Sequence, residues 1–410
     1  MEADVWKELT PGAPGLPERW DRLRSAGSSM GALDRLRERH GPSVSRFVSL
    51  QAELATRHRG RLEVERLPFL TSKGAEQATA APVAHHRAQR FADLGGRWLP
   101  WDACCGVGSD LLALVDRFPR VLATDRDGPT LRCAAANLAH AHGPPEGRWL
   151  AARGDASSPP FAPGARASVL ALFDPDRRPG GAREGRGDRW SPTLEEVLGH
   201  AAGLGGACVK LPPALDPDHL TGPAAGLPLA LSWVSLDGEM KELAAWSGAL
   251  ADGSPAREAI ALRSGGGVAR YSAEPEDAPT TPDAGEPAAG AWLVELDGSL
   301  WRSGLAGAFA REHRAAPLAA PGPGGFLLAD AALAHPMARC WRIEAVCAGD
   351  RKRVRAMLRE RGVGPLTVKT RFHPESAERL ARSLRGEGDR PGLLAVTRTA
   401  GRSVAMLLEE

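Results

Sequence analysis

Residues 98–115, WLPWDACCGVGSDLLALV, contain the stretch that decides the fold. An apolar run that ends at Asp102 is typical of a buried strand, and the apolar spacing from Ser109 onward is typical of a helix. Gly106 and Gly108 allow the backbone to turn sharply between the two and to approach a ligand closely. The stretch therefore predicts a ligand-binding strand–turn–helix unit, in which the N–H groups at the start of the helix face the ligand.

The pattern of strand followed by helix repeats along the next hundred residues. Strands are expected over 97–104, 120–127, 147–156, 166–176 and 206–213, and helices over 109–118, 128–143 and 191–204, the last capped by Ser191. This alternation predicts an α/β fold whose mostly parallel sheet carries helices on both faces. Residues 229–270 predict antiparallel strands instead, because an Asp-Gly turn at 237–238 separates two apolar alternations.

Composition and periodicity divide the chain into five parts. Residues 1–95 carry helical periodicity and predict a helical N-terminal module, and residues 96–270 contain the α/β core. Residues 271–290 are Pro-rich and acidic, which is typical of a linker or loop. Residues 291–340 predict a connecting α/β segment, and the alternation of strand and helix over 341–410 predicts a small α/β domain.

Overall composition restricts the kinds of protein that this chain can be. The 410 residues are 43% hydrophobic and 25% charged, which allows large cores. The net charge of +2 hides a basic C-terminal part, since residues 341–410 hold fifteen Arg or Lys against nine Asp or Glu. Long apolar runs and a signal sequence are missing, so we expect a cytoplasmic protein with no contact to a membrane.

The cysteines and histidines do not predict a metal site. Six cysteines are irregularly spaced without a C-x-x-C motif, which excludes a disulfide framework and favours reduced thiols. The side chains of adjacent Cys104 and Cys105, like those of adjacent His85 and His86, point apart and make poor ligands for one tetrahedral zinc ion. Because no cysteine lies near Asp174, we interpret the cysteines of the glycine turn as packing residues and not as nucleophiles.

Aspartates follow four successive predicted strands. Open α/β sheets bind ligands outside the carboxyl ends of their strands, where Asp102, Asp125, Asp155 and Asp174 all fall. Asp125 is placed to accept hydrogen bonds from ribose hydroxyls and Asp155 to meet the amine of adenine. Asp174 and the following Pro175 lie where an acceptor would enter.

Asp110 indicates which nucleoside this site would bind. A nicotinamide fingerprint needs a third small residue at that position, and a carboxylate there would repel a pyrophosphate. A nucleoside with a positive or zwitterionic tail tolerates both Asp102 and Asp110. S-adenosylmethionine has that character.

Residues 97–215 resemble the class I S-adenosylmethionine-dependent methyltransferases, on the stretches DACCGVGSD, VLATDRD, ARGDA and FDPD. More narrowly, residues 60–410 resemble bacterial methyltransferases that carry a C-terminal THUMP-like domain. The stretches that carry this narrower resemblance are TSKGAEQATAAPVAHHRAQRF, FDPDRRPGG, VKLPPALD, VSLDGEMKELAAW and the tail from LRERGVGPLTVKTRF onward. The glycine loop is also similar, more distantly, to that of the trimethylguanosine synthases.

The resemblance implies a Rossmann-like methyltransferase sheet, S-adenosylmethionine as the cofactor and a base in RNA as the acceptor. Asp174 and Pro175 are the expected catalytic residues. The expected cofactor-binding residues are Asp102, Gly106, Gly108, Asp110, Asp125 and Asp155. In the THUMP-like part, basic residues along one predicted helix and one strand are expected to bind RNA: Arg351, Lys352, Arg355, Arg359, Lys369 and Arg371.

Two departures from the related families keep other functions open. Amine-methylating relatives follow the acid of the fourth strand with Pro-Pro and an aromatic ring, where this chain has Pro175, Asp176 and Arg177. A family Glu-Pro-Asp becomes Glu-Leu-Asp, with Leu296 in place of proline. The alternatives are a non-catalytic RNA-binding protein with a degenerate methyltransferase fold and a small-molecule methyltransferase. A dehydrogenase ranks last because of Asp110, and the sequence leaves the oligomeric state open.

Overall fold

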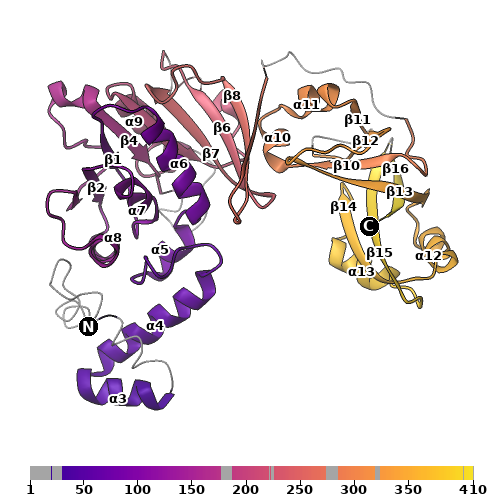
Figure 1. Ribbon diagram of the computed structural model, residues 1–410, viewed down its shortest axis with the longest axis horizontal. Helices are drawn as coiled ribbons and strands as arrows, with labels where there is room; N and C mark the ends of the chain where they lie inside the picture. The colour runs from indigo at the N-terminus through magenta and orange to yellow at the C-terminus, as the bar shows by residue number, and fades with distance from the viewer. Residues whose placement is uncertain are drawn as a thin grey trace. The chain divides into compact units, whose positions relative to one another are not determined.

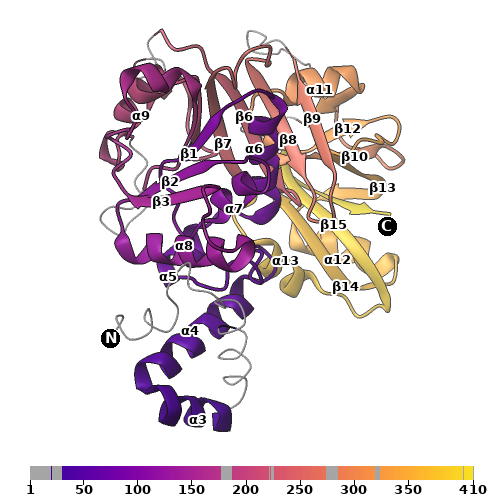
Figure 2. The same ribbon diagram turned by 60° about the vertical axis from the view of Figure 1, so that its left-hand side comes forward.

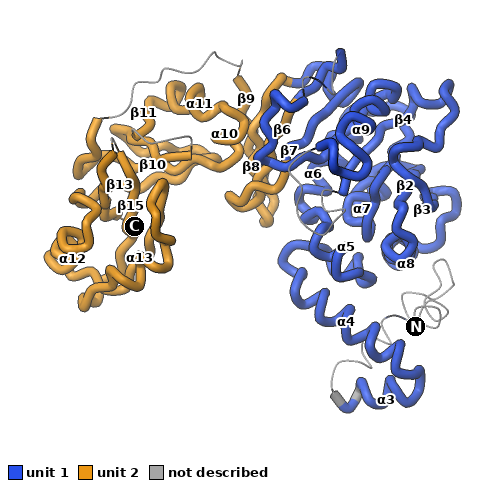
Figure 3. The backbone as a smooth tube through the Cα atoms, turned by 180° about the vertical axis from the view of Figure 1, so that it is seen from behind, with its two compact units in different colours: residues 1–230, 243–254 blue, residues 231–242, 255–410 orange. Residues whose placement is uncertain are grey.

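A computed structural model of the protein describes Trp20 and residues 30–176, 187–220, 222, 226–273, 285–318, 324–399 and 401–409. The chain forms two compact units, residues 1–230 with 243–254 and residues 231–242 with 255–410 (Figure 3). Most of the predicted linker 271–290 and the predicted acceptor-side Arg177 lie outside the described residues.

The first unit contains the predicted parallel sheet. Its strands are β1 (Leu99–Asp102), β2 (Val121–Asp125), β3 (Trp149–Arg153), β4 (Val169–Phe173) and β5 (Gly206–Leu211), in the spatial order β3-β2-β1-β4-β5. Each neighbouring pair among them is parallel. The strand order reverses between β1 and β4, and ligands of open α/β sheets bind at such a switch point.

Helices cover both faces of this sheet, as predicted. Helices α7 (Ser109–Val115) and α8 (Gly128–His142) connect β1, β2 and β3 in one direction, and α9 (Leu194–Ala201) connects β4 to β5 in the other. Since such crossovers are right-handed, opposite directions place the helices on opposite faces. Figures 1 and 2 both show α8 and α9 on opposite sides of the strands.

The N-terminal module is helical, as predicted, with α3 (Met30–His40), α4 (Pro42–His58), α5 (Ser72–Gln77) and α6 (Ala81–Asp93). The side chain of Thr71 caps α5 by accepting a hydrogen bond from the Gly74 N–H at 2.9 Å.

The predicted cap of α9 is wrong. Thr193, not Ser191, is the N-cap, because Glu196 lies three residues after it and completes a reciprocal capping box. The backbone of Ser191 instead pairs with that of Asp176.

The prediction of antiparallel strands over 229–270 is correct in part. β6 (Ala230–Leu236) and β7 (Glu239–Gly248) flank the predicted turn, where Asp237 and Gly238 have φ values of 53° and 87°. β8 (Arg257–Leu262), however, pairs with β6 in parallel, and β9 (Val268–Ser272) then pairs with β8 antiparallel. The chain crosses to the far edge of β6 after β7, so β8 runs in the direction of β6.

The rest of the second unit is α/β, as predicted for its C-terminal part. Its elements are β10 (Trp292–Leu296), α10 (Gly298–Arg302), α11 (Ala306–Glu312), β11 (Ala315–Pro317), β12 (Leu327–Ala329), β13 (Ala338–Ala348), α12 (Arg351–Glu360), β14 (Val363–Arg371), α13 (Ala377–Leu384), β15 (Arg390–Thr399) and β16 (Arg402–Leu408). The strands form a seven-stranded sheet in the order β11-β12-β10-β13-β16-β15-β14. Buried side chains of α12 and α13, among them Leu358 and Leu384, share a core with Leu394 and Leu407 of the sheet.

Candidate cofactor and acceptor site

The glycine turn between β1 and α7 has one open side and one packed side. Gly106 and Gly108 have φ values of 55° and 95°, a backbone region that other residues rarely adopt. A Cβ atom on Gly106 would meet no described atom within 4 Å, whereas one on Gly108 would lie 3.4 Å from the Cα atom of Ala134 in α8. Gly106 thus leaves room beside the turn, and Gly108 lets α8 pack against it.

Asp102 ends β1 and lies next to this turn. Asp102 is 1% exposed, and its Oδ2 atom has no hydrogen-bond partner among the described residues. Burial, reinforced by the charge of Asp110, raises the pKa of Asp102 well above its usual value. A buried carboxylate oxygen without a partner is suited to receive a cationic group of a ligand.

Asp125 ends β2 on the other side of the turn. Its Oδ2 atom accepts the Gly106 N–H at 2.9 Å, and its Oδ1 atom accepts the Asp127 N–H at 2.8 Å. Burial raises the pKa of Asp125, and the two N–H groups oppose that effect. The backbone therefore fixes this carboxylate beside Gly106, and each oxygen keeps a lone pair that can accept a hydroxyl proton.

Asp155 and Asp174 also follow their strands as predicted. Asp155 is exposed just after β3, and its Oδ1 atom accepts hydrogen bonds from the N–H and hydroxyl of Ser157. Asp174 follows β4, is partly exposed, and its Oδ2 atom accepts a hydrogen bond from the ammonium group of Lys210. Pro175 is buried directly behind Asp174.

Asp110, predicted to bind the cofactor, lies in a buried polar network. Thr79 donates to its Oδ2 atom at 2.5 Å, and Arg87 donates to its Oδ1 atom. The Nζ atom of Lys210 lies 3.5 Å from Oδ2. Burial raises the pKa of Asp110, but the charges of Arg87 and Lys210 oppose this effect and bring the pKa below its usual value. Both carboxylate oxygens therefore already have protein partners, and a role of Asp110 in cofactor binding stays a prediction.

The sequence analysis did not identify Thr79, Arg87 or Lys210 as site residues. Lys210 had a usable signal, because it is the one charged residue in the otherwise apolar strand GACVKL. Thr79 and Arg87 stand in the stretch TSKGAEQATAAPVAHHRAQRF that carries the family resemblance, but no local pattern indicates that they contact Asp110, because that contact depends on tertiary packing.

Asp176 replaces the second proline of the amine-methylating pattern. Its carboxylate accepts a hydrogen bond from Lys73 at 2.9 Å and lies 4.0 Å from the guanidinium group of Arg126. Both cationic side chains are half or more exposed, 64% for Lys73 and 50% for Arg126. Among the described residues, two cations, Lys73 and Arg126, thus flank Asp176 on the rim beside Asp174.

The two cysteines of the turn are free thiols, Cys105 buried and Cys104 partly buried. Burial, followed by nearby carboxylates, raises the pKa of both thiols, which keeps them protonated. Among the described residues, no group of three His, Cys, Asp or Glu side chains could hold a metal ion. No helix in the described ranges is long and apolar enough to cross a membrane.

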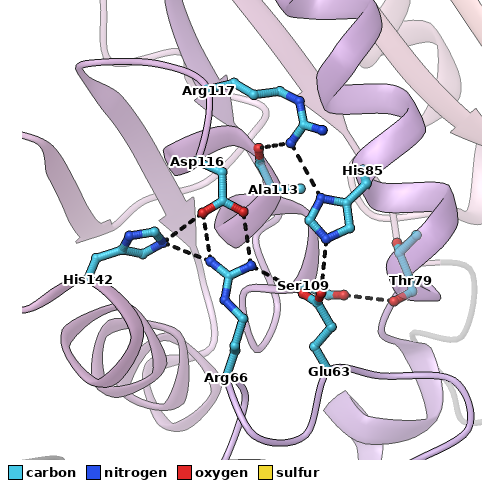
Figure 4. Close-up of polar contacts among 9 residues, drawn as sticks. All are labelled: Glu63, Arg66, Thr79, His85, Ser109, Ala113, Asp116, Arg117 and His142. Carbon is cyan, nitrogen blue, oxygen red and sulfur yellow. Dashed lines mark hydrogen bonds and ion pairs between the residues drawn. The ribbon is translucent and has the colours of Figure 1, made fainter.

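A second polar cluster connects the N-terminal module to the core away from these acids (Figure 4). Arg66 forms two hydrogen bonds with Asp116, at 2.7 and 2.9 Å, and Asp116 also lies 3.4 Å from His142 of α8. His85 of α6 contacts Glu63 at 3.1 Å. Burial raises the pKa of Asp116, but the hydrogen bond from Arg66 opposes this effect and brings the pKa below its usual value. This cluster fastens the module to α7 and α8.

The basic residues predicted to bind RNA fall into two groups. Lys369 and Arg371 of β14 both pair with Glu295 of β10, at 2.7 and 2.6 Å. Glu295 belongs to the Glu-Leu-Asp segment that replaces the Glu-Pro-Asp of the family. Asp297 of the same segment caps α10.

The four predicted RNA-binding residues of α12 are all exposed. Arg351 pairs with Glu375 at 2.8 Å, and Arg355 donates to the Ser383 carbonyl oxygen. The side chains of Lys352 and Arg359 have neither a hydrogen bond nor an ion pair with any residue that the structure describes.

Three comparisons agree with this architecture. Residues 338–410 match the family model described as "THUMP domain-like". An uncharacterized S-adenosylmethionine-dependent methyltransferase of Mycobacterium tuberculosis, from strains CDC 1551 / Oshkosh and ATCC 25618 / H37Rv, is 28% identical over 344 residues, 82% of this chain and 86% of the relative. A crystal structure from Porphyromonas gingivalis W83, provisionally described as that of a methyltransferase, has a TM-score of 0.73 at 18% identity and covers 95% of this chain and 97% of that one.

The fold is that of a class I methyltransferase followed by a C-terminal THUMP-like domain, which confirms the predicted resemblance and fold class. The predicted enzyme class and cofactor, a methyltransferase that uses S-adenosylmethionine, agree with the curated relatives.

Proposed function

We propose that this S-adenosylmethionine-dependent methyltransferase methylates a base in RNA and that its THUMP-like part contributes to RNA binding. The observation that carries the proposal is the set of carboxylates at the carboxyl ends of β1, β2 and β4 around an open glycine turn, with the Oδ2 atom of Asp102 lacking a described partner.

The residues of the turn fit S-adenosylmethionine. Asp102 offers a buried anion to the positively charged tail, and Asp125 offers two fixed oxygens to ribose hydroxyls. Asp155, together with Gly106, Gly108 and Asp110, completes the proposed cofactor-binding set. When bound, the cofactor supplies an electrophilic methyl group on a sulfonium, so the protein contributes mainly alignment.

Asp174 and Pro175 form the proposed acceptor side. Pro175 is buried and holds the chain after β4 in place, while the partly exposed Asp174 can accept a proton or a hydrogen bond from the acceptor atom. On this rim two cations, Lys73 and Arg126, share the single carboxylate of Asp176, and this local excess of positive charge favours an acceptor that carries phosphate, as a nucleotide of RNA does. This rim argues against an uncharged small-molecule acceptor.

Replacing Asp125 with alanine is expected to weaken the binding of S-adenosylhomocysteine about 100-fold, because two charge-assisted hydrogen bonds to ribose are lost. Isothermal titration calorimetry measures the affinity. Asp93→Ala removes an exposed carboxylate at the end of α6 and should leave the affinity unchanged. Wild-type protein that shows no heat of binding would exclude the cofactor, and full affinity in Asp125→Ala would exclude its ribose role.

Neutralising the unpartnered pair on α12, as Lys352→Gln/Arg359→Gln, is expected to lower the slope of log affinity against log salt for RNA by about 1 to 2. Each lost phosphate contact removes slightly less than one released counterion. Arg37→Gln/Arg39→Gln, on the exposed face of α3, is the matched control. An unchanged slope in the α12 variant would show that this helix does not contact the phosphates.

Transfer of a radiolabelled methyl group to total RNA from a strain that lacks the gene separates enzyme from binding protein. Incorporation by the wild type excludes a degenerate, non-catalytic fold. Incorporation that requires a small-molecule extract and not RNA would favour the small-molecule alternative.

A further inference from the structure

Lys210 is a buried lysine at the carboxyl end of β5. Its residue is 9% exposed, and its strand neighbours Val209 and Leu211 are almost fully buried. The register that pairs Phe173 of β4 with Val209 of β5 places Lys210 next to Asp174. Burying an ammonium group costs free energy unless partners replace its water, so an apolar side chain would serve packing better at this position.

The ammonium group has a partner for each of its three protons. It donates to Asp174 and to the Thr79 hydroxyl, the latter at 2.7 Å, and lies 3.5 Å from the Oδ2 atom of Asp110. Thr79 in turn donates to Asp110, and Arg87 holds the other oxygen of that carboxylate. The position of the ammonium group is therefore determined from three sides.

These partners belong to the two halves of the proposed site. Asp110 lies in the first turn of α7, directly after the glycine turn that would hold the cofactor, and Asp174 lies on the acceptor side after β4. The Nζ atom of Lys210 is the contact that both carboxylates share. It fixes Asp174 relative to α7, and methyl transfer requires acceptor and donor to be aligned within a fraction of an ångström.

We propose that Lys210 is a positioning residue for methyl transfer: its ammonium group, set by Thr79 and Asp110, holds the Asp174 carboxylate in the orientation that receives the acceptor. This inference rests on the proposed function and names a residue that acts through Asp174, without touching the acceptor itself.

The primary test is Lys210→Met, which keeps most of the length of the side chain and removes its charge. We expect methyl transfer to total RNA to fall about 100-fold, the low end of what a misplaced catalytic group costs. The affinity for S-adenosylhomocysteine, measured by calorimetry, should stay within about threefold, because Asp102 and Asp125 are unchanged and Arg87 still holds the carboxylate of Asp110. Lys210→Arg should recover part of the lost activity, since a guanidinium group also pairs with carboxylates.

A double-mutant cycle separates positioning from a general structural effect. If Lys210 acts through Asp174, adding Lys210→Met to Asp174→Asn should lower activity by less than about threefold further. If the two losses multiply instead, the inference is overturned. Lys241→Met is the matched control. Among the described residues Lys241 pairs only with the exposed Glu239 of its own strand β7, so its loss should leave activity unchanged.

If thermal unfolding shows that Lys210→Met does not fold, Thr79→Val provides a second test. It removes the hydroxyl that joins Lys210 to Asp110 and should lower methyl transfer about tenfold with cofactor affinity preserved. Full activity in either folded variant overturns the positioning role. If the wild type binds the cofactor yet methylates no RNA, both the proposed function and this inference are contradicted. If the wild type is active and the Lys210→Met variant is equally active, only the inference is contradicted.

Discussion

Replacing Asp174 with asparagine is expected to lower methyl transfer by about 100- to 10,000-fold, the range in which a positioned acid or base contributes to catalysis. Asparagine keeps the shape of the side chain but loses the anion that receives the acceptor proton and pairs with Lys210. The measurement is the initial rate of methyl transfer to RNA at saturating cofactor.

Cofactor binding is the accompanying control. The affinity of Asp174→Asn for S-adenosylhomocysteine should equal that of the wild type, because Asp174 lies on the acceptor side of the site. Asp116→Asn removes a carboxylate of the same unit that pairs with Arg66, and its methyl transfer rate should be unchanged. A wild-type rate of methyl transfer in Asp174→Asn would show that the reaction does not need the Asp174 carboxylate and that another group receives the acceptor.

Replacing Asp102 with asparagine is expected to have opposite effects on ligand binding and on stability. Loss of the buried anion should weaken the binding of S-adenosylmethionine about 10- to 100-fold, the value of a hydrogen bond to a charged group. The protein without cofactor should become more stable, because burial disfavours the charged form of Asp102 and asparagine carries no charge. Each kcal/mol gained raises Tm by roughly 2–4 °C in a domain of this size.

The same reasoning gives a pH dependence with a definite sign. The pKa of Asp102 is raised in the folded state, so the folded protein binds a proton more tightly than the unfolded chain does. The stability linked to that proton is fully present below the unfolded pKa and is lost as pH rises through the folded pKa. Cofactor affinity should rise over the same interval, because only the ionised carboxylate attracts the positively charged tail.

Calorimetry and thermal unfolding from pH 4 to pH 9 measure both trends. Asp102→Asn should flatten the two profiles, while Asp93→Asn, on an exposed carboxylate, should leave them as in the wild type. Parallel curves for Asp102→Asn and the wild type would show that another group controls the pH dependence.

The sequence sufficed for the parts of the fold that local patterns determine. The alternation of apolar runs and helical spacing predicts β1 to β5 with their helices, and the positions of Asp102, Asp125 and Asp174 at strand ends follow from that alternation. The Asp-Gly turn at 237–238 likewise predicts the β6–β7 hairpin. The parallel pairing of β8 with β6 depends on which edge the chain reaches after β7, and no local pattern encodes that choice.

The candidate site was predictable only where its residues follow the strands of the core. Thr79, between α5 and α6, and Arg87 of α6 precede the glycine turn in the sequence, and their approach to Asp110 depends on tertiary packing. The partners of Lys369 and Arg371 show the same limitation, because Glu295 lies more than seventy positions earlier in the chain. A count of charges along the sequence treats Lys369 and Arg371 as free cations, although the structure pairs both of them with Glu295.

The contacts of Thr79 and Arg87 decide how the chain can be divided for experiments. A fragment that begins at residue 96, the predicted start of the core, keeps the glycine turn but loses the Thr79 hydroxyl and the Arg87 guanidinium group, which donate hydrogen bonds to Asp110. It would leave Asp110 buried beside Lys210 alone, and it would expose the apolar face of α7 that α6 covers. A minimal catalytic fragment must therefore include the helical segment from Thr71 onward, so the N-terminal helices belong to the enzyme's working part and are not a detachable appendage.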